Sequence, residues 1–161
     1  MIKELYLAGG CFWGVEAYFK SIEGIVETKV GYSNGKTDNT TYEKVSETDH
    51  AETVYIKYDD SIISLDKILE YLYHVVDPFS INKQGNDKGR QYRTGIYSKD
   101  QNTLEIAKEF ISKKQEEENQ EIQIEVEILK NFIPAEEYHQ NYLEKNPDGY
   151  CHINLSDKPN I

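Results

Sequence analysis

The strongest constraint on the fold is that segments with the apolar spacing of strands alternate along the chain with segments that have the apolar spacing of helices. Residues 3–8, 26–30 and 53–58 alternate apolar with polar side chains, which is typical of strands with one buried face. Residues 13–22 and 65–76 instead repeat their apolar side chains at helical spacing. Together the patterns predict strands over 3–8, 26–30, 53–58, 93–97 and 122–128, and helices over 13–22, 65–76 and 101–111.

Local signals set several boundaries of the predicted helices. Ser64 is placed to cap the second helix, because its side chain can accept a hydrogen bond from a free backbone N–H of the first turn. Pro78 requires that helix to end near Asp77, since the residue before a proline avoids helical angles. Ser98, followed three residues later by Gln101, makes a capping box that starts the third helix.

The resulting order of elements is β-α-β, β-α, β-α-β. We expect a loop over residues 82–93 and a largely irregular tail from about residue 131, with one short helix near 135–144. This order predicts an α/β (α+β) two-layer sandwich, in which helices cover one face of a mixed sheet with a split βαβ, ferredoxin-like core. Nothing in the composition divides the chain, so we expect a single domain over residues 1–161.

The composition argues against several classes of function. The chain has 29 acidic and 18 basic residues, and its net charge of −11 disfavours nucleic acids and anionic membranes as partners. It has neither an apolar run long enough to span a membrane nor a signal peptide, so a cytoplasmic location is expected. Two cysteines do not make a disulfide scaffold, and the spacings typical of zinc and nucleotide sites are missing. We therefore expect no metal ion and no nucleotide cofactor.

The segment Gly9-Gly10-Cys11-Phe12-Trp13-Gly14 carries the clearest chemical signal. Its glycines allow a sharp turn between the first strand and the first helix, which places Cys11 at the helix N-terminus. Free N–H groups and the helix dipole stabilise a thiolate there, so we expect a lowered thiol pKa and a nucleophilic cysteine. Phe12 and Trp13 beside it are suited to form an apolar pocket for a small group such as a methyl.

This segment resembles the signature of the peptide methionine sulfoxide reductase A family. Further matches follow in the family's order and extend from Leu5 to about Tyr150. They are Gly31-Tyr32-Ser33-Asn34-Gly35, Thr41-Tyr42-Glu43-Lys44-Val45, His50-Ala51-Glu52, Gln84-Gly85-Asn86-Asp87, Gly89-Arg90-Gln91-Tyr92-Arg93, Tyr138-His139-Gln140 and Tyr142.

The resemblance implies thiol-dependent reduction of methionine (S)-sulfoxide, free or in proteins, to methionine. Cys11 would attack the sulfoxide sulfur as a thiolate, and its product would be a sulfenic acid. Protons for the departing oxygen would come from Glu52, which needs a raised pKa, and from Tyr42 and Tyr92. The remaining roles that the family implies are hydrogen bonding by Asp87 and binding of the substrate methyl by Phe12 and Trp13.

Regeneration of the enzyme would need a second thiol. Cys151, the other cysteine, lies in the tail and is the candidate for resolving the sulfenic acid as a disulfide. An external thiol is the other possibility that the family offers. Thioredoxin, glutaredoxin or dithiothreitol would be the reductant, no other cofactor is expected, and the chain is expected to be a monomer.

Two other classes of function compete with the reductase. A cysteine hydrolase or acyltransferase would use Cys11 with His50 or His139 as its base, and predicts an imidazole hydrogen-bonded to the thiol. A non-catalytic binding module would use the aromatic pair Phe12-Trp13 to capture a partner. The reductase instead predicts a carboxyl and phenols around Cys11.

Overall fold

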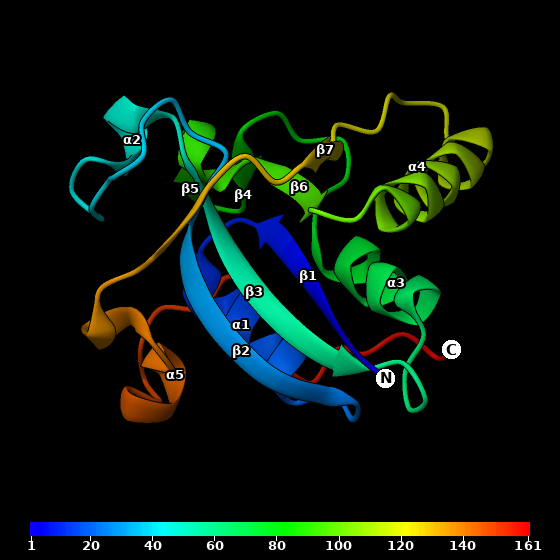
Figure 1. Ribbon diagram of the computed structural model, residues 1–161, viewed down its shortest axis with the longest axis horizontal. Coiled ribbons are helices and arrows are strands. Elements are labelled where there is room, and N and C mark those ends of the chain that lie inside the picture. Colours follow the sequence, from blue (N-terminus) through cyan, green and yellow to red (C-terminus); the bar gives the residue numbers. More distant parts are fainter.

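The computed structural model describes all 161 residues and contains a six-stranded sheet of order β7-β6-β1-β3-β2-β8 (Figure 1). Three longer helices accompany the sheet, and short helical and strand segments lie in the connections. The strands of the sheet are β1 (Ile2–Gly9), β2 (Ile25–Ser33), β3 (Ala51–Asp59), β6 (Thr94–Ser98), β7 (Glu125–Ile128) and β8 (Phe132–Pro134). The helices are α1 (Phe12–Lys20), α2 (Val45–Thr48), α3 (Leu65–Val75), α4 (Gln101–Glu116) and α5 (Tyr142–Lys145).

The sheet confirms the predicted split βαβ core. β3 lies between β1 and β2 and is antiparallel to both, while β6 is antiparallel to β1 on the other side. The order β6-β1-β3-β2, with α1 joining β1 to β2 and α3 following β3, is the ferredoxin-like arrangement. β7 then adds to β6 in parallel, so the whole sheet is mixed as expected.

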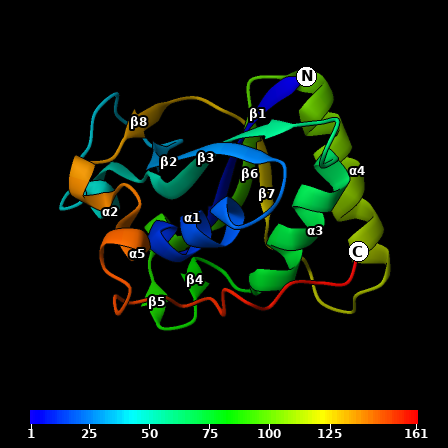
Figure 2. The same cartoon turned by 90° about the horizontal axis from the view of Figure 1, so that it is seen from below.

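The helices cover one face of this sheet. Figure 1 shows α1 behind β2 and β3, with α3 and α4 beside it, and Figure 2 shows the same layer from below. Leu5 and Leu7 point into the larger apolar core with the helices, whereas Tyr6 and Ala8 belong to a smaller cluster on the other face. Successive side chains of β1 therefore alternate between two faces of the sheet, and both faces are buried, one by a larger and the other by a smaller apolar cluster.

The start of α4 corrects the predicted capping box at Ser98. Asp100 is the N-cap, and its Oδ2 accepts hydrogen bonds from the backbone N–H of Thr103 at 3.1 Å and from the Thr103 hydroxyl at 2.8 Å. The Ser98 hydroxyl oxygen accepts from the Asp100 N–H instead. Asp100 directly precedes Gln101, the first helical residue, so its side chain can accept from the free N–H of Thr103 in the first turn. Ser98 lies two residues further from the helix than Asp100.

Replacing Asp100 with alanine is expected to lower Tm by about 2–4 °C, because the first turn of α4 loses its side-chain acceptor. Ser98→Ala is the matched control and should lower Tm by less than Asp100→Ala. Thermal unfolding followed by circular dichroism measures both. An equal or larger decrease of Tm in Ser98→Ala would show that Ser98 caps the helix, as the sequence predicts.

The strand predicted over 122–128 is shorter than its alternation suggests. β7 begins only at Glu125, although Ile122 and Ile124 are buried in the main core. β7 has a single neighbour, and its pairing with β6 runs only from Gly95 to Ser98. Residues before Glu125 alternate because the core covers every second side chain, and they lack a strand with which to form a ladder.

Two further corrections concern the loop expected over 82–93 and the helix expected near 135–144. The loop over 82–93 contains a small hairpin, β4 (Lys83–Gln84) with β5 (Asp87–Lys88), and the 3-10 helix η1 (Arg90–Tyr92). The helix expected near 135–144 is divided into η2 (Glu137–His139) and α5, because Asn141 adopts a left-handed φ of 54° between them. No helix has the length and apolarity that crossing a membrane requires.

The C-terminal tail is tied to the helix layer by named contacts. The Tyr18 hydroxyl on α1 donates to the carbonyl of Asp157 at 3.0 Å, and His74 on α3 pairs with the Asp157 carboxylate at 2.9 Å. Gln140 hydrogen-bonds both the N–H and the C=O of Val30 and so holds the segment before α5 against β2. In Figure 2 the tail runs past β5 and β4 toward α3. Cys151 and His152 in this tail lie against Gly14 in the first turn of α1.

Candidate active site

The turn between β1 and α1 places Cys11 where the sequence predicts it. Gly10 has a φ of 93°, and a Cβ at this position would lie 2.7 Å from Cβ of Gln84, so only glycine fits. Cys11 is the N-cap residue of α1 and is 5% exposed, and α1 begins at Phe12. Its thiol is therefore buried at the helix N-terminus.

The pKa of the Cys11 thiol differs from the predicted direction. Burial raises this pKa strongly, and the nearby Glu52 carboxyl raises it further. The N–H groups of Trp13 and Gly14 act the other way, as expected at a helix N-terminus, but their effect is smaller. The resting cysteine is thus a thiol, because loss of solvent outweighs the helix N-terminus.

Glu52 is the buried carboxyl that faces this turn. It is the second residue of β3, it is 1% exposed, and its Oε1 accepts a hydrogen bond from the Phe12 N–H at 3.1 Å. Burial raises the pKa of Glu52 to about 8, although the Phe12 N–H acts in the opposite direction. Near pH 7 most of the Glu52 side chains carry a proton, as the sequence analysis required of a proton donor.

Aromatic rings form the wall beside Cys11. The ring of Tyr42 stacks on Phe12 and on Trp13 at centroid distances of 6.4 Å in each case. On its other side, Trp13 stacks on Tyr142 at 3.8 Å with an angle of 10° between the rings. Phe12 is fully buried and also packs on Tyr32. The wall combines rings from α1, the loop before α2, and α5.

The two phenols predicted to donate protons both lie near enough to Glu52 and Cys11 for these groups to raise their pKa values. Tyr42 lies in the loop before α2, and Tyr92 ends η1. Burial raises the pKa of Tyr42 to about 12, with smaller contributions from Glu52 and Cys11. Burial also raises the pKa of Tyr92, followed by effects of Glu52 and Tyr42. Both phenols therefore keep their protons at neutral pH.

Asp87 and Cys151 come from two segments that contact each other, the β4–β5 hairpin and the C-terminal tail. Asp87 is in the β4–β5 hairpin, and its carboxylate accepts a hydrogen bond from the Tyr150 hydroxyl at 3.0 Å. Cys151 follows Tyr150 in the tail, and its Sγ lies 3.0 Å from where a Cβ on Gly14 would stand. The tail thus carries the second thiol to the first turn of α1, which begins beside Cys11.

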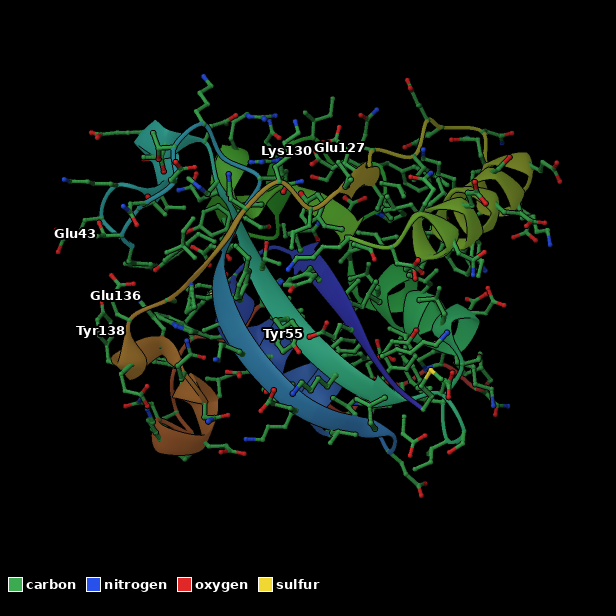
Figure 3. The ribbon with its side chains drawn as sticks, in the orientation of Figure 1. Glu43, Tyr55, Glu127, Lys130, Glu136 and Tyr138 are labelled. Atoms are coloured by element: carbon green, nitrogen blue, oxygen red, sulfur yellow. The ribbon has the colours of Figure 1, made fainter.

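The structure also shows two anchoring residues that the sequence analysis missed. Glu136 accepts hydrogen bonds from the Tyr32 hydroxyl at 2.7 Å and from the Tyr42 N–H at 3.1 Å, so it fixes the Tyr42 loop. Figure 3 shows it beside Tyr138 on the edge where η2 lies. Its partners are distant in sequence, and no local pattern marks it.

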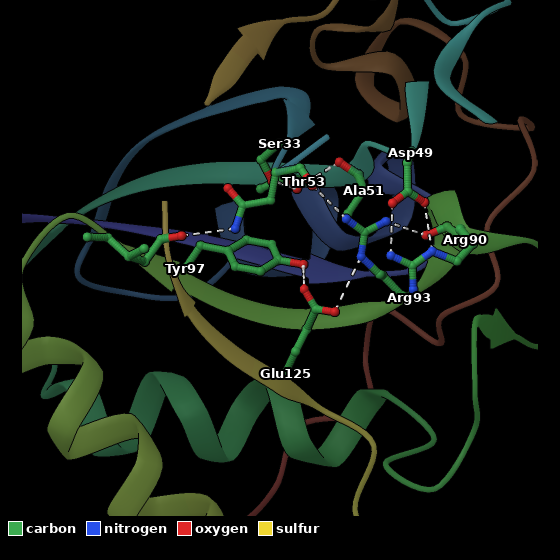
Figure 4. A network of polar contacts seen from close by, with 10 residues as sticks. Ser33, Asp49, Ala51, Thr53, Arg90, Arg93, Tyr97 and Glu125 are labelled. Carbon is green, nitrogen blue, oxygen red and sulfur yellow. Dashed lines mark hydrogen bonds and ion pairs between the residues drawn. The ribbon is translucent and has the colours of Figure 1, made fainter. Parts of the chain in front are cut away.

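Arg93 is the other anchor, and it follows Tyr92 directly. Its guanidinium is buried, donates to the carbonyls of Arg90 at 2.8 Å and Asn34 at 3.0 Å, and pairs with Glu125 at 3.4 Å (Figure 4). These bonds hold the end of η1 between β2 and β7. Its partners Asn34 and Glu125 are distant in the sequence, so no local pattern marks this residue either.

The histidines do not support the hydrolase alternative. Nδ1 of His139 accepts a hydrogen bond from the Trp13 indole N–H at 2.9 Å, and Nδ1 of His50 is bonded to the Thr48 hydroxyl at 2.8 Å. Neither imidazole forms a hydrogen bond with the Cys11 thiol, which this alternative requires. The groups that act on Cys11 are the carboxyls Glu52 and Asp87. No group of three or more His, Cys, Asp or Glu side chains is arranged to hold a metal ion.

The fold and this grouping define a class of protein with a ferredoxin-like core and a buried cysteine at a strand-to-helix turn, faced by a protonated carboxyl and walled by aromatic rings. The sequence profile described as peptide methionine sulfoxide reductase matches residues 3–160. The chain belongs to this family.

Individual relatives agree over nearly the whole chain. It is 56% identical over 160 residues to the peptide methionine sulfoxide reductase MsrA of Malacoplasma penetrans, covering 98% of this chain and 100% of the relative. The crystal structure of reduced Mxr1 from Saccharomyces cerevisiae matches with a TM-score of 0.89 and 38% identity, over 97% of this chain and 93% of that one. Mxr1 in complex with Trx2 matches with a TM-score of 0.63 and 24% identity, over 88% and 84% of the two chains.

Proposed function

We propose that this protein reduces methionine-S-sulfoxide, free or within polypeptides, to methionine. The observation that carries this proposal is the family match over residues 3–160 together with a Cys11 thiol that faces a protonated carboxyl. A sulfoxide is reduced by a nucleophile that attacks sulfur and an acid that protonates oxygen, and Glu52 accepts a hydrogen bond from the backbone N–H of Phe12, the residue after Cys11.

In the first step, the Cys11 sulfur attacks the sulfoxide sulfur while Glu52 gives its proton to the sulfoxide oxygen. The thiol proton passes to the Glu52 carboxylate, so Cys11 becomes a thiolate only as it reacts. The protonated oxygen then moves from the substrate sulfur to the Cys11 sulfur, so that the new bond between the two sulfurs and the S–O bond of the substrate both break and Cys11 is left as a sulfenic acid. Methionine sulfoxide is thereby reduced by two electrons to methionine, Cys11 is oxidised by two, and Glu52 finishes protonated.

The surrounding side chains have supporting roles in this proposal. Tyr42 and Tyr92 keep their phenolic protons and donate hydrogen bonds to the oxygen as negative charge develops on it. Asp87 orders the polar side of the pocket through hydrogen bonds, and Phe12 and Trp13 hold the substrate methyl. Burial supports these roles, because hydrogen bonds strengthen where water is excluded.

The second half of the cycle restores the Cys11 thiol. The Cys151 thiol attacks the sulfenic sulfur, the hydroxyl leaves as water with the Cys151 proton, and a Cys11–Cys151 disulfide forms. A dithiol reductant then exchanges with this disulfide and leaves as its own disulfide. Contact between the tail and the first turn of α1 supports this assignment. The Trx2 complex of the yeast relative supports thioredoxin as the reductant, and glutaredoxin is the alternative.

Replacing Cys151 with serine is expected to lower turnover with thioredoxin at least tenfold, because no internal thiol remains to convert the Cys11 sulfenic acid into the disulfide that thioredoxin reduces. Without reductant, the variant should still form about one methionine per enzyme, since the first step uses Cys11 alone. Stopped assays for methionine with the parent and the variant measure both quantities. Full turnover with thioredoxin in Cys151→Ser would show that an external thiol resolves the sulfenic acid directly.

We further propose that the protein acts as a monomer in a reducing cytoplasm. Both cysteines are free, and the cycle consumes a dithiol that a reducing compartment supplies. Sedimentation of the purified chain tests the first part of this statement. A dimer whose partner contributes to the pocket would overturn it.

A further inference from the structure

The chain has only two arginines among its 18 basic residues, and both are placed around η1. Arg90 begins η1, Arg93 follows its last residue, and Tyr92 lies between them. A guanidinium donates from several nitrogens in one plane, so lysine does not replace it at a contact with more than one acceptor. The turn that carries one of the proposed donors to the sulfoxide oxygen is therefore flanked by the two side chains best suited to fix it.

Arg93 holds η1 on the inner side. Its buried guanidinium donates from Nη1 to the carbonyl of Arg90 at 2.8 Å and from Nη2 to the carbonyl of Asn34 at 3.0 Å. Its Nε has no hydrogen-bond partner and lies 3.4 Å from Oε1 of Glu125, with which it forms an ion pair. The other carboxylate oxygen of Glu125 accepts from the Tyr97 hydroxyl at 2.8 Å (Figure 4). Glu125 thus connects the first carbonyl of η1 to the edge strand β7.

Arg90 holds η1 on the outer side. Its Nε and Nη2 donate to the two carboxylate oxygens of Asp49 at 2.7 Å and 3.0 Å, which is the two-point contact of a planar cation with a carboxylate. Asp49 lies just before β3, the strand that carries Glu52. This pair therefore connects η1 to the strand of the proposed acid, whereas Arg93 connects η1 to the end of β2 and to β7.

Tyr92 takes its position from this turn. Its backbone N–H donates to the carbonyl of Gly89 at 2.9 Å, and the residue is half-buried. Burial raises the pKa of Tyr92 most, and Glu52 and Cys11 raise this pKa further, so the phenol lies near both groups. A donor stabilises developing charge only if its position is fixed before the reaction, and a displacement of about 1 Å can cost about 10²-fold in rate.

We propose that two carboxylates, Glu125 and Asp49, are positioning residues for the Tyr92 phenol. They act through Arg93 and Arg90, which hold η1 and so keep the phenol beside the oxygen of the bound sulfoxide. This inference rests on the proposed function for its substrate. Neither carboxylate touches the reacting atoms or gives a proton. Glu125 has the larger effect, because its ion pair is buried on the arginine side, whereas the arginine of the Asp49 pair is exposed.

Substitutions that remove one charge and keep the shape of the side chain test the proposal. Single turnovers without reductant isolate the first step of the cycle. At saturating methionine-S-sulfoxide, Glu125→Gln should lower the rate of this step about tenfold and Asp49→Asn about threefold, with half-saturating concentrations within about twofold of the parent. Glu127→Gln, at an exposed glutamate of the same strand, is the matched control and should keep both constants.

An unchanged rate in a folded Glu125→Gln would overturn the proposal. Where this variant fails to fold, an unchanged rate in Asp49→Asn, whose ion pair is more exposed, would overturn it in the same way.

Combination with Tyr92→Phe separates the positioning of Tyr92 from a general loss of structure. Because Tyr92→Phe removes the phenol, adding Glu125→Gln or Asp49→Asn to it should lower the rate by less than about twofold further. A merely structural role predicts instead that each substitution lowers the rate by the same factor with and without the phenol. Such multiplied effects would overturn the proposal.

The parent protein offers a measurement that does not depend on turnover. Since the chain has only two arginines, nitrogen-15 NMR can assign both guanidinium groups. A guanidinium held by several partners rotates slowly, so Arg93 should show separate signals for its two Nη atoms, and Glu125→Gln should merge them. Merged Arg93 signals in the parent would overturn the proposal. A parent with separate signals that fails to reduce methionine-S-sulfoxide would refute the proposed function, and the positioning role with it, while the contacts of Arg93 would stand.

Discussion

Cys11→Ser is expected to abolish reduction of methionine-S-sulfoxide, lowering kcat/KM by about 10⁴-fold or more. A serine hydroxyl is a far weaker nucleophile toward sulfur, and it has no sulfenic acid state in which to receive the oxygen. The substitution changes one buried atom, and sulfur and oxygen are close in size, so the fold should remain. Methionine formation with dithiothreitol, followed by chromatography, measures the loss.

Two controls separate loss of the nucleophile from loss of the pocket. Circular dichroism and the emission of Trp13 should be the same in Cys11→Ser and the parent. Cys151→Ser, which removes the other thiol, should keep the first turnover. A folded Cys11→Ser that retains a tenth or more of the parent activity would exclude Cys11 as the group that takes the oxygen.

Glu52→Gln is expected to lower kcat/KM by about 10²–10⁴-fold, the usual contribution of a general acid. Glutamine has nearly the same shape, and its Oε1 can still accept from the Phe12 N–H. It has no acidic proton to give to the sulfoxide oxygen. Initial rates with methionine-S-sulfoxide at pH 7 measure the effect, and activity within fivefold of the parent would contradict the assignment of the acid to Glu52.

The pH dependence of the parent follows from the same residue. Because Glu52 has a pKa of about 8 and must carry its proton to react, kcat/KM should be level below pH 8 and fall about tenfold for each further pH unit. This fall should be missing in Glu52→Gln, whose residual activity uses no carboxyl proton. A rate that instead rises through pH 8 in the parent would indicate that a thiolate formed in advance limits the reaction.

The pH dependence of the free energy of unfolding should show the raised pKa of Glu52 independently of catalysis. The folded-state pKa lies above the value of 4.5 for an unperturbed glutamate, so between these values the folded chain keeps a proton that the unfolded chain has lost. The free energy of unfolding of the parent should therefore fall, relative to Glu52→Gln, as pH rises from about 4.5 to about 8. At 1.36 kcal/mol per pKa unit the relative change is at most about 5 kcal/mol. Guanidinium unfolding of both proteins at pH 5 and pH 9 measures it.

Sequence reasoning predicted the core of the fold because burial in a two-layer sandwich leaves a period in the chain. The strands around β1 and β3 and the helices α1 and α3 follow that period closely. β7 is shorter than its alternation suggests because pairing depends on a neighbour, which no local pattern reports. The start of α4 was misplaced because Ser98 and Asp100 offer competing caps, and three-dimensional spacing decides between them.

For the candidate site, the grouping of residues was predictable and their electrostatics were only partly so. The glycines around Cys11 marked the turn, and the family resemblance supplied Glu52, Tyr42, Tyr92 and Asp87. The raised pKa of Glu52 agrees with the expectation, but that of Cys11 is opposite to it, because the sequence shows the helix N-terminus and conceals the extent of burial. Glu136 and Arg93 act through contacts more than 20 residues away, and the sequence contains no local mark of them.

The most direct test of the proposed function is turnover of the separated S- and R-epimers of methionine sulfoxide by the full chain with dithiothreitol. We predict that the S-epimer is converted to methionine over many cycles and that the R-epimer remains unchanged. Turnover of the R-epimer alone, or of neither epimer by a folded protein with a reduced Cys11, would contradict the proposal.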